Sequence, residues 1–128
     1  MTILENKLNN WQFGYLVLAA FLVVSLTACG GAPEAPPALE ITLTAFDIEW
    51  DTTNFDALVG QSITITVVNK GLLDHNLIIE KFGIDVDISP GATETVTFMV
   101  TEPGTIDFIC DEPGHLEAGM AGTITVTE

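Results

Sequence analysis

The sequence predicts an all-β protein, a Greek-key β-sandwich of seven or eight short strands. Three observations support this fold class. Along residues 39–128, apolar and polar residues alternate in short runs, turn-forming residues separate the runs, and no segment has the apolar periodicity of a long helix. Alternation with a period of two turns one face of each strand toward a shared core, as expected of two packed sheets.

The expected strands follow one another at regular intervals. In residues 41–50 the parity of the apolar positions switches between Ala45 and Phe46, which predicts a β-bulge at that point. A second strand covers 63–67, and a third begins at His75. The remaining runs lie at 84–88, 96–100, 106–110 and 122–126. Turn signals separate the runs at 69–71, 89–91, 103–104 and 113–114.

The N-terminal segment predicts export. Trp11 to Ala28 is a stretch of eighteen residues without a charge, preceded by a short polar start, and residues 1–28 therefore fit a signal peptide. The sequence at its end, 26–29, resembles the lipobox of bacterial lipoproteins, in which the cysteine, here Cys29, carries the lipid. An uncleaved signal-anchor helix is the alternative. Either route places the remainder outside the cytoplasm, in the periplasm or on the outer face of the cytoplasmic membrane.

Residues 29–38 are expected to form the lipid anchor and a flexible tether. Residues 30–38 contain three prolines and two glycines and have no apolar periodicity. The folded domain is therefore expected to cover 39–128. It is large enough for one modest core, and a bound metal would help to stabilise it.

The charge of the chain restricts its partners. The net charge is −15, and Lys70 and Lys81 are the only cationic side chains after residue 38. Nucleic acids and anionic lipid surfaces would repel such a protein, because binding them requires clustered basic residues. A protein partner is expected to be basic where the two surfaces meet.

One loop concentrates metal-binding side chains. Cys110, His115 and Met120 follow one another at equal spacing, with four residues between successive members. Cys110 and Met120 share the parity of the inward residues of their strands, so all three are expected to converge at one end of the sandwich. His75 is the only other histidine and supplies the fourth candidate ligand. Two imidazoles, a thiolate and a weak thioether suit a blue copper site better than a zinc site.

These residues resemble those of the cupredoxins. The resemblance extends over residues 39–128 and is carried by the pair His75-Asn76, the loop from Cys110 to Met120, and the segment 119–126. The loop spacing is most similar to that of auracyanins and rusticyanin. The resemblance implies one mononuclear type 1 copper held by His75, Cys110, His115 and Met120. It also implies that Asn76 forms a hydrogen bond with the cysteine loop.

The resemblance implies electron transfer rather than catalysis. Both histidines are used by one site, which leaves none for a catalytic copper, so the chain is not expected to be an enzyme. A module that stores or delivers copper outside the cytoplasm is the alternative, and a metal-free surface module is a third hypothesis. The expected partners are redox proteins, such as a membrane oxidoreductase, a cytochrome, an oxidase or a photosynthetic reaction centre.

The surface around the loop suggests how partners dock. The resemblance implies that electrons leave through His115. Pro113 and Leu116 are expected to form an apolar patch around it, and Leu72 and Leu73 are further candidates for this patch. Three acids, Asp111, Glu112 and Glu117, are expected to lower the reduction potential and to attract a basic partner.

Overall fold

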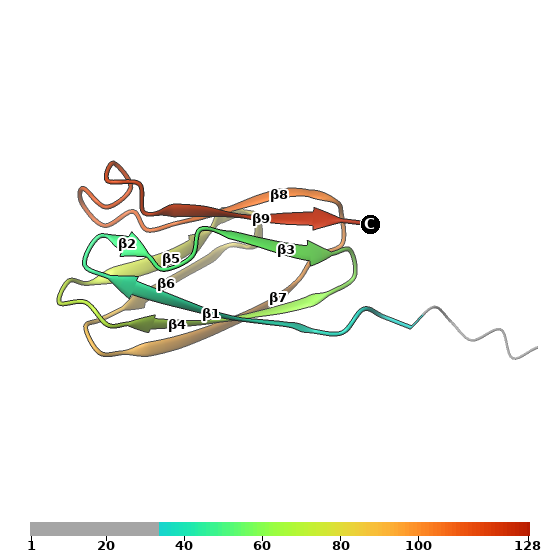
Figure 1. Cartoon of the computed structure of the whole chain (residues 1–128), viewed down its shortest axis with the longest axis horizontal. Coiled ribbons are helices and arrows are strands. Elements are labelled where there is room, and N and C mark those ends of the chain that lie inside the picture. The colour runs from blue at the N-terminus through green and yellow to red at the C-terminus, as the bar shows by residue number, and fades with distance from the viewer. Residues whose placement is uncertain (1–33) are drawn as a thin grey trace, which may run out of the picture. The chain divides into compact units, whose positions relative to one another are not determined.

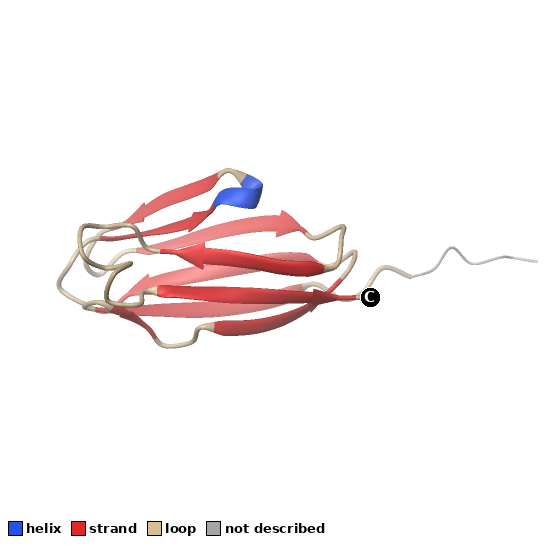
Figure 2. Cartoon of the chain, turned by 90° about the horizontal axis from the view of Figure 1, so that it is seen from above, coloured by secondary structure: helices blue, strands red, loops and turns tan. Residues whose placement is uncertain are grey.

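The computed structural model describes residues 34–128. In this part of the chain, two sheets pack face to face as a β-sandwich (Figures 1 and 2). The predicted signal peptide, the lipobox with Cys29 and the tether up to residue 33 lie outside the described residues. Among the residues described, no helix has the length and apolar character needed to cross a membrane.

The two sheets are mixed. The four-stranded sheet has the order β2-β1-β4-β7 and comprises β2 (Glu49–Trp50), β1 (Leu39–Phe46), β4 (Ser62–Asn69) and β7 (Thr93–Met99). The five-stranded sheet has the order β3-β9-β8-β5-β6 and comprises β3 (Asn54–Leu58), β9 (Ala121–Thr127), β8 (Gly104–Ile109), β5 (His75–Ile79) and β6 (Ile84–Ile88). β1 runs parallel to β4, and β3 parallel to β9, whereas the other pairs are antiparallel. A 3-10 turn, η1 (Glu80–Phe82), connects β5 to β6.

The alternating sequence forms the core as expected. In β4, Ile63, Ile65 and Val67 are buried between the sheets, while the residues between them face outward. Phe108 of β8 is fully buried, with its ring centroid 5.8 Å from that of Phe55 and 6.4 Å from that of Trp50. The contact with Trp50 joins β2 of the four-stranded sheet to the five-stranded sheet, of which Phe55 and Phe108 are both part.

The predicted bulge at Ala45 and Phe46 is wrong. The chain reverses at Asp47 and Ile48, and Trp50 of β2 pairs with Ala45 of β1. The parity changes because the chain turns back, so Phe46 and Ile48 are exposed instead of facing the core. Residues 41–50 therefore supply two strands instead of one.

Three chain segments that carry the candidate ligands meet at one end of the sandwich (Figure 1). β5 begins at His75, β8 ends just before Cys110, and β9 begins just after Met120. The first described residues and the C-terminus lie at the opposite end. The fold thus separates the candidate metal site from the first described residues.

Candidate metal centre

Three metal-binding side chains converge in the interior at this end. The sulfur of Cys110 lies 3.8 Å from Nδ1 of His75 and 3.4 Å from Nδ1 of His115. The ligand atoms of the three residues all lie within 4.8 Å of one another. His75 and Cys110 are completely buried, and His115 is 6% exposed. The start of β5 and the end of β8 therefore bring together His75 and Cys110, which are 35 positions apart in the sequence.

Two turns fold the loop between Cys110 and Met120. The N–H of His115 donates to the carbonyl of Glu112 (2.9 Å), and Pro113 and Gly114 occupy the central positions, with φ of +87° at Gly114. This is the pattern of a type II turn, in which the third residue needs a positive φ and is usually glycine. The N–H of Met120 then donates to the carbonyl of His115 (3.0 Å). These bonds turn His115 back toward the cysteine.

Met120 completes the donor set. Its side chain is fully buried, and its carbonyl accepts from the N–H of Cys110 (3.0 Å). The separations in the cluster fit a metal ion, because bonds of about 2.0 Å to nitrogen and about 2.3 Å to sulfur in a trigonal plane place the two atoms about 3.7 Å apart. Two imidazoles and one thiolate with a weak axial thioether are the ligands of blue copper. The residues present therefore fit a type 1 copper.

Burial changes the acidity of two of the ligands. Desolvation lowers the pKa of His75 below 6.5, and the neighbouring His115 lowers it further, whereas Asp47 and Asp74 act in the opposite direction. Burial raises the pKa of Cys110 above 9.0, partly opposed by backbone hydrogen bonds from Asn76 and Glu112. Both shifts favour the uncharged side chain in the metal-free protein. A bound cation would reverse this preference at Cys110.

The stability of the metal-free protein is expected to be greatest between about pH 6.5 and pH 9. As pH falls below 6.5, His75 takes up a proton in the unfolded chain before it does so in the folded one, so the free energy of unfolding falls. As pH rises above 9.0, Cys110 loses its proton first in the unfolded chain, so that free energy falls again. Urea unfolding from pH 5 to pH 10.5 would measure this dependence. A His75→Gln variant that retained the entire acid limb would contradict the assignment to His75.

Asn76 links the strand of one ligand to the loop of another. Its side-chain oxygen accepts from the N–H of Asp111 (3.0 Å), and its amide nitrogen donates to Oδ1 of the same residue (2.8 Å). The structure thus places Asn76 in contact with the cysteine loop. Asp111, one of the three acids expected to attract a partner, thus forms hydrogen bonds with Asn76 through both its N–H and its carboxylate, and it is also exposed.

The surface around the loop is apolar and acidic. Leu116 is 42% exposed and Pro113 is exposed, whereas the ring of His115 lies just below the surface. Leu72 is 85% exposed and Leu73 44%. The turn at Asp47 and Ile48 lies at the same end (Figure 1) and adds Phe46 and Ile48, two exposed apolar side chains that sequence reasoning assigned to the core.

Trp50 is a further neighbour that the sequence did not reveal. It is 5% exposed, and its ring centroid lies 6.2 Å from that of His75. The rings of His75 and His115 are 4.9 Å apart. An aromatic ring therefore lies beside the buried histidine. The turn that reverses the chain before β2 brings it there, and no spacing pattern in the sequence indicated this.

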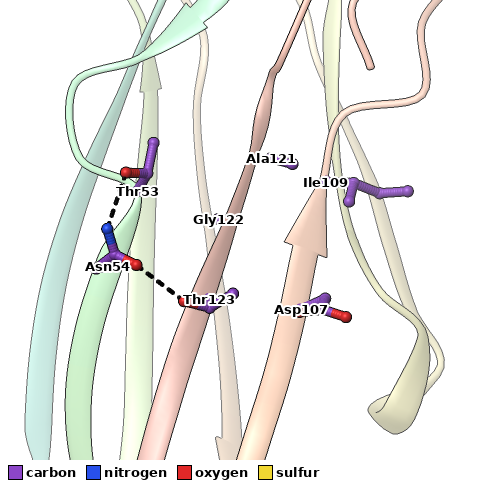
Figure 3. Close-up of a pocket in the computed structure, with 7 residues that line it drawn as sticks. All are labelled: Thr53, Asn54, Asp107, Ile109, Ala121, Gly122 and Thr123. Carbon is purple, nitrogen blue, oxygen red and sulfur yellow. Dashed lines mark hydrogen bonds between the residues drawn. The ribbon is translucent and has the colours of Figure 1, made fainter. Parts of the chain in front are cut away.

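A separate shallow pocket of about 440 Å³ lies on the outer face of the five-stranded sheet (Figure 3). Asn54 links its neighbours there, since it donates to Thr53 (3.1 Å) and accepts from Thr123 (2.9 Å). The pocket is lined by Thr53, Asn54, Asp107, Ile109, Ala121, Gly122 and Thr123. None of the four candidate ligands lines it. The metal centre is therefore not part of this pocket.

Comparisons with known proteins agree with this site. The family described as cupredoxin-like domain matches residues 16–126. Auracyanin-B from Chloroflexus aurantiacus is 50% identical over 40 residues, which span 31% of this chain and 17% of that protein. Plastocyanin from Daucus carota is 34% identical over 100 residues, which span 69% of this chain and 99% of the relative. The crystal structure of dithionite-reduced auracyanin from Roseiflexus castenholzii has a TM-score of 0.64 at 25% identity, covering 73% of this chain and all of that one.

Proposed function

The chain belongs to the cupredoxin family, and we propose that it is a membrane-tethered blue copper protein that carries single electrons between redox complexes outside the cytoplasm. The observation that supports this most directly is the buried convergence of His75, Cys110 and His115, with Met120 adjoining them in the backbone hydrogen bonding. Auracyanins and plastocyanin, to which the chain is similar, favour a carrier over an enzyme.

The protein is proposed to hold the four donor side chains in nearly their final positions before copper binds. Copper held by His75, Cys110, His115 and Met120 would supply one-electron exchange between Cu(I) and Cu(II). The turn bonds of the loop and the packing of the imidazoles restrict movement of the donors, so the site would change little between the two oxidation states. Burial excludes water from the ligands. The site would thus keep four protein donors and leave no position for a substrate.

His115 is the proposed exit for electrons. Of the two histidines, His115 is the more exposed, at 6% of the residue against 0% for His75. Pro113 and Leu116 flank it in the loop, and both are exposed. An apolar surface above the histidine would let a partner approach closely without leaving charged groups unpaired.

The N-terminal segment supports the proposed tether. Residues 26–29 resemble a lipobox, and Trp11 to Ala28 carries no charge. The first described residues lie at the end of the domain opposite to the strand ends that carry the candidate ligands (Figure 1). Attachment at that end would leave the metal centre accessible to partners.

A Cys29→Ser variant is expected to lose its membrane attachment or to remain unprocessed, because a serine cannot carry the thioether-linked lipid. Fractionation of cells that express the full chain, followed by detection of the protein in membrane and soluble fractions, would measure this. Labelling with a lipid precursor should mark the wild type only. Unchanged processing and labelling of the serine variant would contradict lipidation at Cys29.

The partners are proposed to be redox proteins with a basic docking surface. Glu112 and Glu117 flank the proposed exit, and the chain carries a net charge of −15. Oppositely charged surfaces accelerate association and orient the partners. The chemistry of the surface suits a respiratory or a photosynthetic partner equally.

The visible spectrum of the copper-loaded protein tests this function. An intense thiolate-to-copper band that bleaches with ascorbate and returns on oxidation is the expected result. A stable copper complex that lacks this band would favour storage or delivery of copper. Failure to bind copper at all would favour a metal-free surface module.

Replacing Glu112 and Glu117 together by glutamine is expected to slow electron transfer to a basic c-type cytochrome about tenfold at low ionic strength, because electrostatic steering accelerates association by at least this factor. The rate should also depend less on salt. Stopped-flow mixing at several ionic strengths would measure both effects. Glu40→Gln with Glu102→Gln is the matched control, because it removes two exposed glutamates that lie at the start of β1 and just before β8, away from the end of β8 that leads to Cys110. Equal slowing by both pairs would indicate an effect of net charge alone.

A further inference from the structure

Few backbone pairs connect the strand that begins with His75 to the strand that precedes Cys110. β5 and β8 share a single paired position, Ile78 with Ile109. By comparison, the antiparallel pairing of β8 with β9 covers six positions and that of β5 with β6 covers five. The ladder between β5 and β8 therefore does not extend to the two metal-binding residues. Their mutual placement must depend on other contacts.

The side chain of Asn76 supplies these contacts at the metal end. It directly follows His75, and its main partner, Asp111, directly follows Cys110. Besides its two hydrogen bonds with Asp111, Asn76 donates to Oδ1 of Asp85 on β6 at 3.4 Å. Asn76 is 6% exposed, and the three bonds use its oxygen and both protons of its amide group.

We propose that Asp85 and Asp111 are positioning residues of the metal site, which hold the side chain of Asn76 from two sides and thereby fix His75 relative to Cys110. This inference rests on the proposed copper site. It assigns to Asp111 a role inside the site besides the expected one in docking, and to Asp85, a residue of the edge strand, a role that its position in the sequence does not suggest.

The chemistry of the contacts supports this role. Both acceptors are carboxylates, and a hydrogen bond to a carboxylate is stronger than one between neutral groups. The bond to Asp111 is the shorter of the two, so it should contribute more than the bond to Asp85. With both protons donated to carboxylates, the amide cannot rotate without losing these bonds. The amide oxygen then stays directed at the N–H of Asp111. The backbone of Asn76, which directly follows His75, is then restrained as well.

The first test is copper affinity of the full chain in detergent, measured by competition with a chromophoric Cu(I) chelator. Asp111→Ala is expected to weaken binding about tenfold, since loss of groups that orient metal ligands commonly costs this much or more. Asp85→Ala is expected to weaken it less. The blue band should shift in both variants. Wild-type affinity and an unshifted band in both alanine variants would overturn the proposal.

Conservative variants separate positioning from charge. Asp111→Asn retains an oxygen that accepts from Asn76, so its affinity and band should stay closer to the wild type than those of Asp111→Ala. Asp87→Asn is the matched control, because Asp87 lies on the same strand, is exposed, and pairs in register with Asn76 without a side-chain hydrogen bond to it. It should behave as the wild type. Equal effects of Asp87→Asn and Asp85→Ala would overturn the proposal in favour of general electrostatics.

A metal-free measurement makes the inference independent of copper. The backbone N–H of Asp111 donates to Asn76, and its hydrogen exchange should be about two- to tenfold faster in Asp85→Ala, as expected for loss of one modest hydrogen bond. Asp87→Asn should leave the rate unchanged. Unchanged exchange in Asp85→Ala would overturn the proposal. If the wild type showed no blue band, the proposed function would fail, and this exchange measurement would still decide the positioning role. If Asp111→Ala does not fold, the copper affinity and the exchange rate of Asp85→Ala still test the proposal.

Discussion

A Cys110→Ser variant is expected to lose the blue colour completely and to bind copper far more weakly. The intense band requires a thiolate, and a serine hydroxyl offers a harder donor that keeps its proton at neutral pH. The sulfur of Cys110 is the atom that approaches both imidazoles, at 3.8 and 3.4 Å, so its removal takes away the centre of the cluster. Absorption spectra of the copper-loaded variant and wild type at equal protein concentration would measure the loss.

The fold should survive this replacement. Serine has nearly the same shape as cysteine, and its hydroxyl can hydrogen-bond to the imidazole of His75 or His115. Burial of the hydroxyl without a partner would cost about 1–3 kcal/mol. Circular dichroism of the metal-free variant would confirm that the sheets form. A folded Cys110→Ser protein that retained the band would contradict the assignment of Cys110 as the thiolate ligand.

Met120→Leu is the informative companion variant. Leucine keeps the apolar volume at this fully buried position but offers no donor atom. The two imidazoles and the thiolate remain, so the blue band should persist. The reduction potential should change, because the axial ligand tunes it. Complete loss of colour would show that Met120 is needed to form the site itself.

The sequence predicted the sandwich because its signal is local. Each inward residue of β4 is identified by its alternation with outward ones, and this requires no knowledge of distant segments. The turn at Asp47 and Ile48 could not be distinguished from a bulge, since a two-residue reversal and an inserted residue both change the parity. β3 was missed because Asn54 to Leu58 is short and only one of its residues, Ala57, is buried.

The candidate ligands could also be predicted from the sequence, but for a different reason. Cys110, His115 and Met120 lie in one loop at a regular spacing, and His75 was the only remaining histidine. Residues that act through tertiary contacts leave no such pattern. Trp50 lies beside His75 because a turn places it there, and the carboxylate of Asp85 reaches Asn76 from a neighbouring strand. Such contacts depend on strand order, which alternation does not determine.

Gly122→Ala is expected to destabilise the domain by about 3 kcal/mol, the upper part of the usual range for adding volume to a packed core. A methyl group at Gly122 would overlap the ring of Phe108 and lie 2.6 Å from the carbonyl oxygen of Thr53. Phe108 pairs in register with Gly122 and is itself held between Trp50 and Phe55. The ring therefore has little space to move, and the backbone oxygen can give way only if β3 shifts. Urea unfolding of the metal-free protein, followed by circular dichroism, would measure the loss.

Two further variants separate the causes of this loss. Gly91→Ala adds a methyl group where nothing lies within 4 Å, but at a φ of +80°, so it measures backbone strain alone, about 1–2 kcal/mol. Phe108→Leu shortens the side chain that Gly122→Ala would strike. If the overlap with the ring dominates, the double variant should be clearly more stable than the sum of the single effects implies. Strict additivity would assign the cost to the contact with the Thr53 carbonyl. A wild-type free energy of unfolding in Gly122→Ala would contradict the packing of Phe108 over this strand, which positions the start of β9 beside the metal centre.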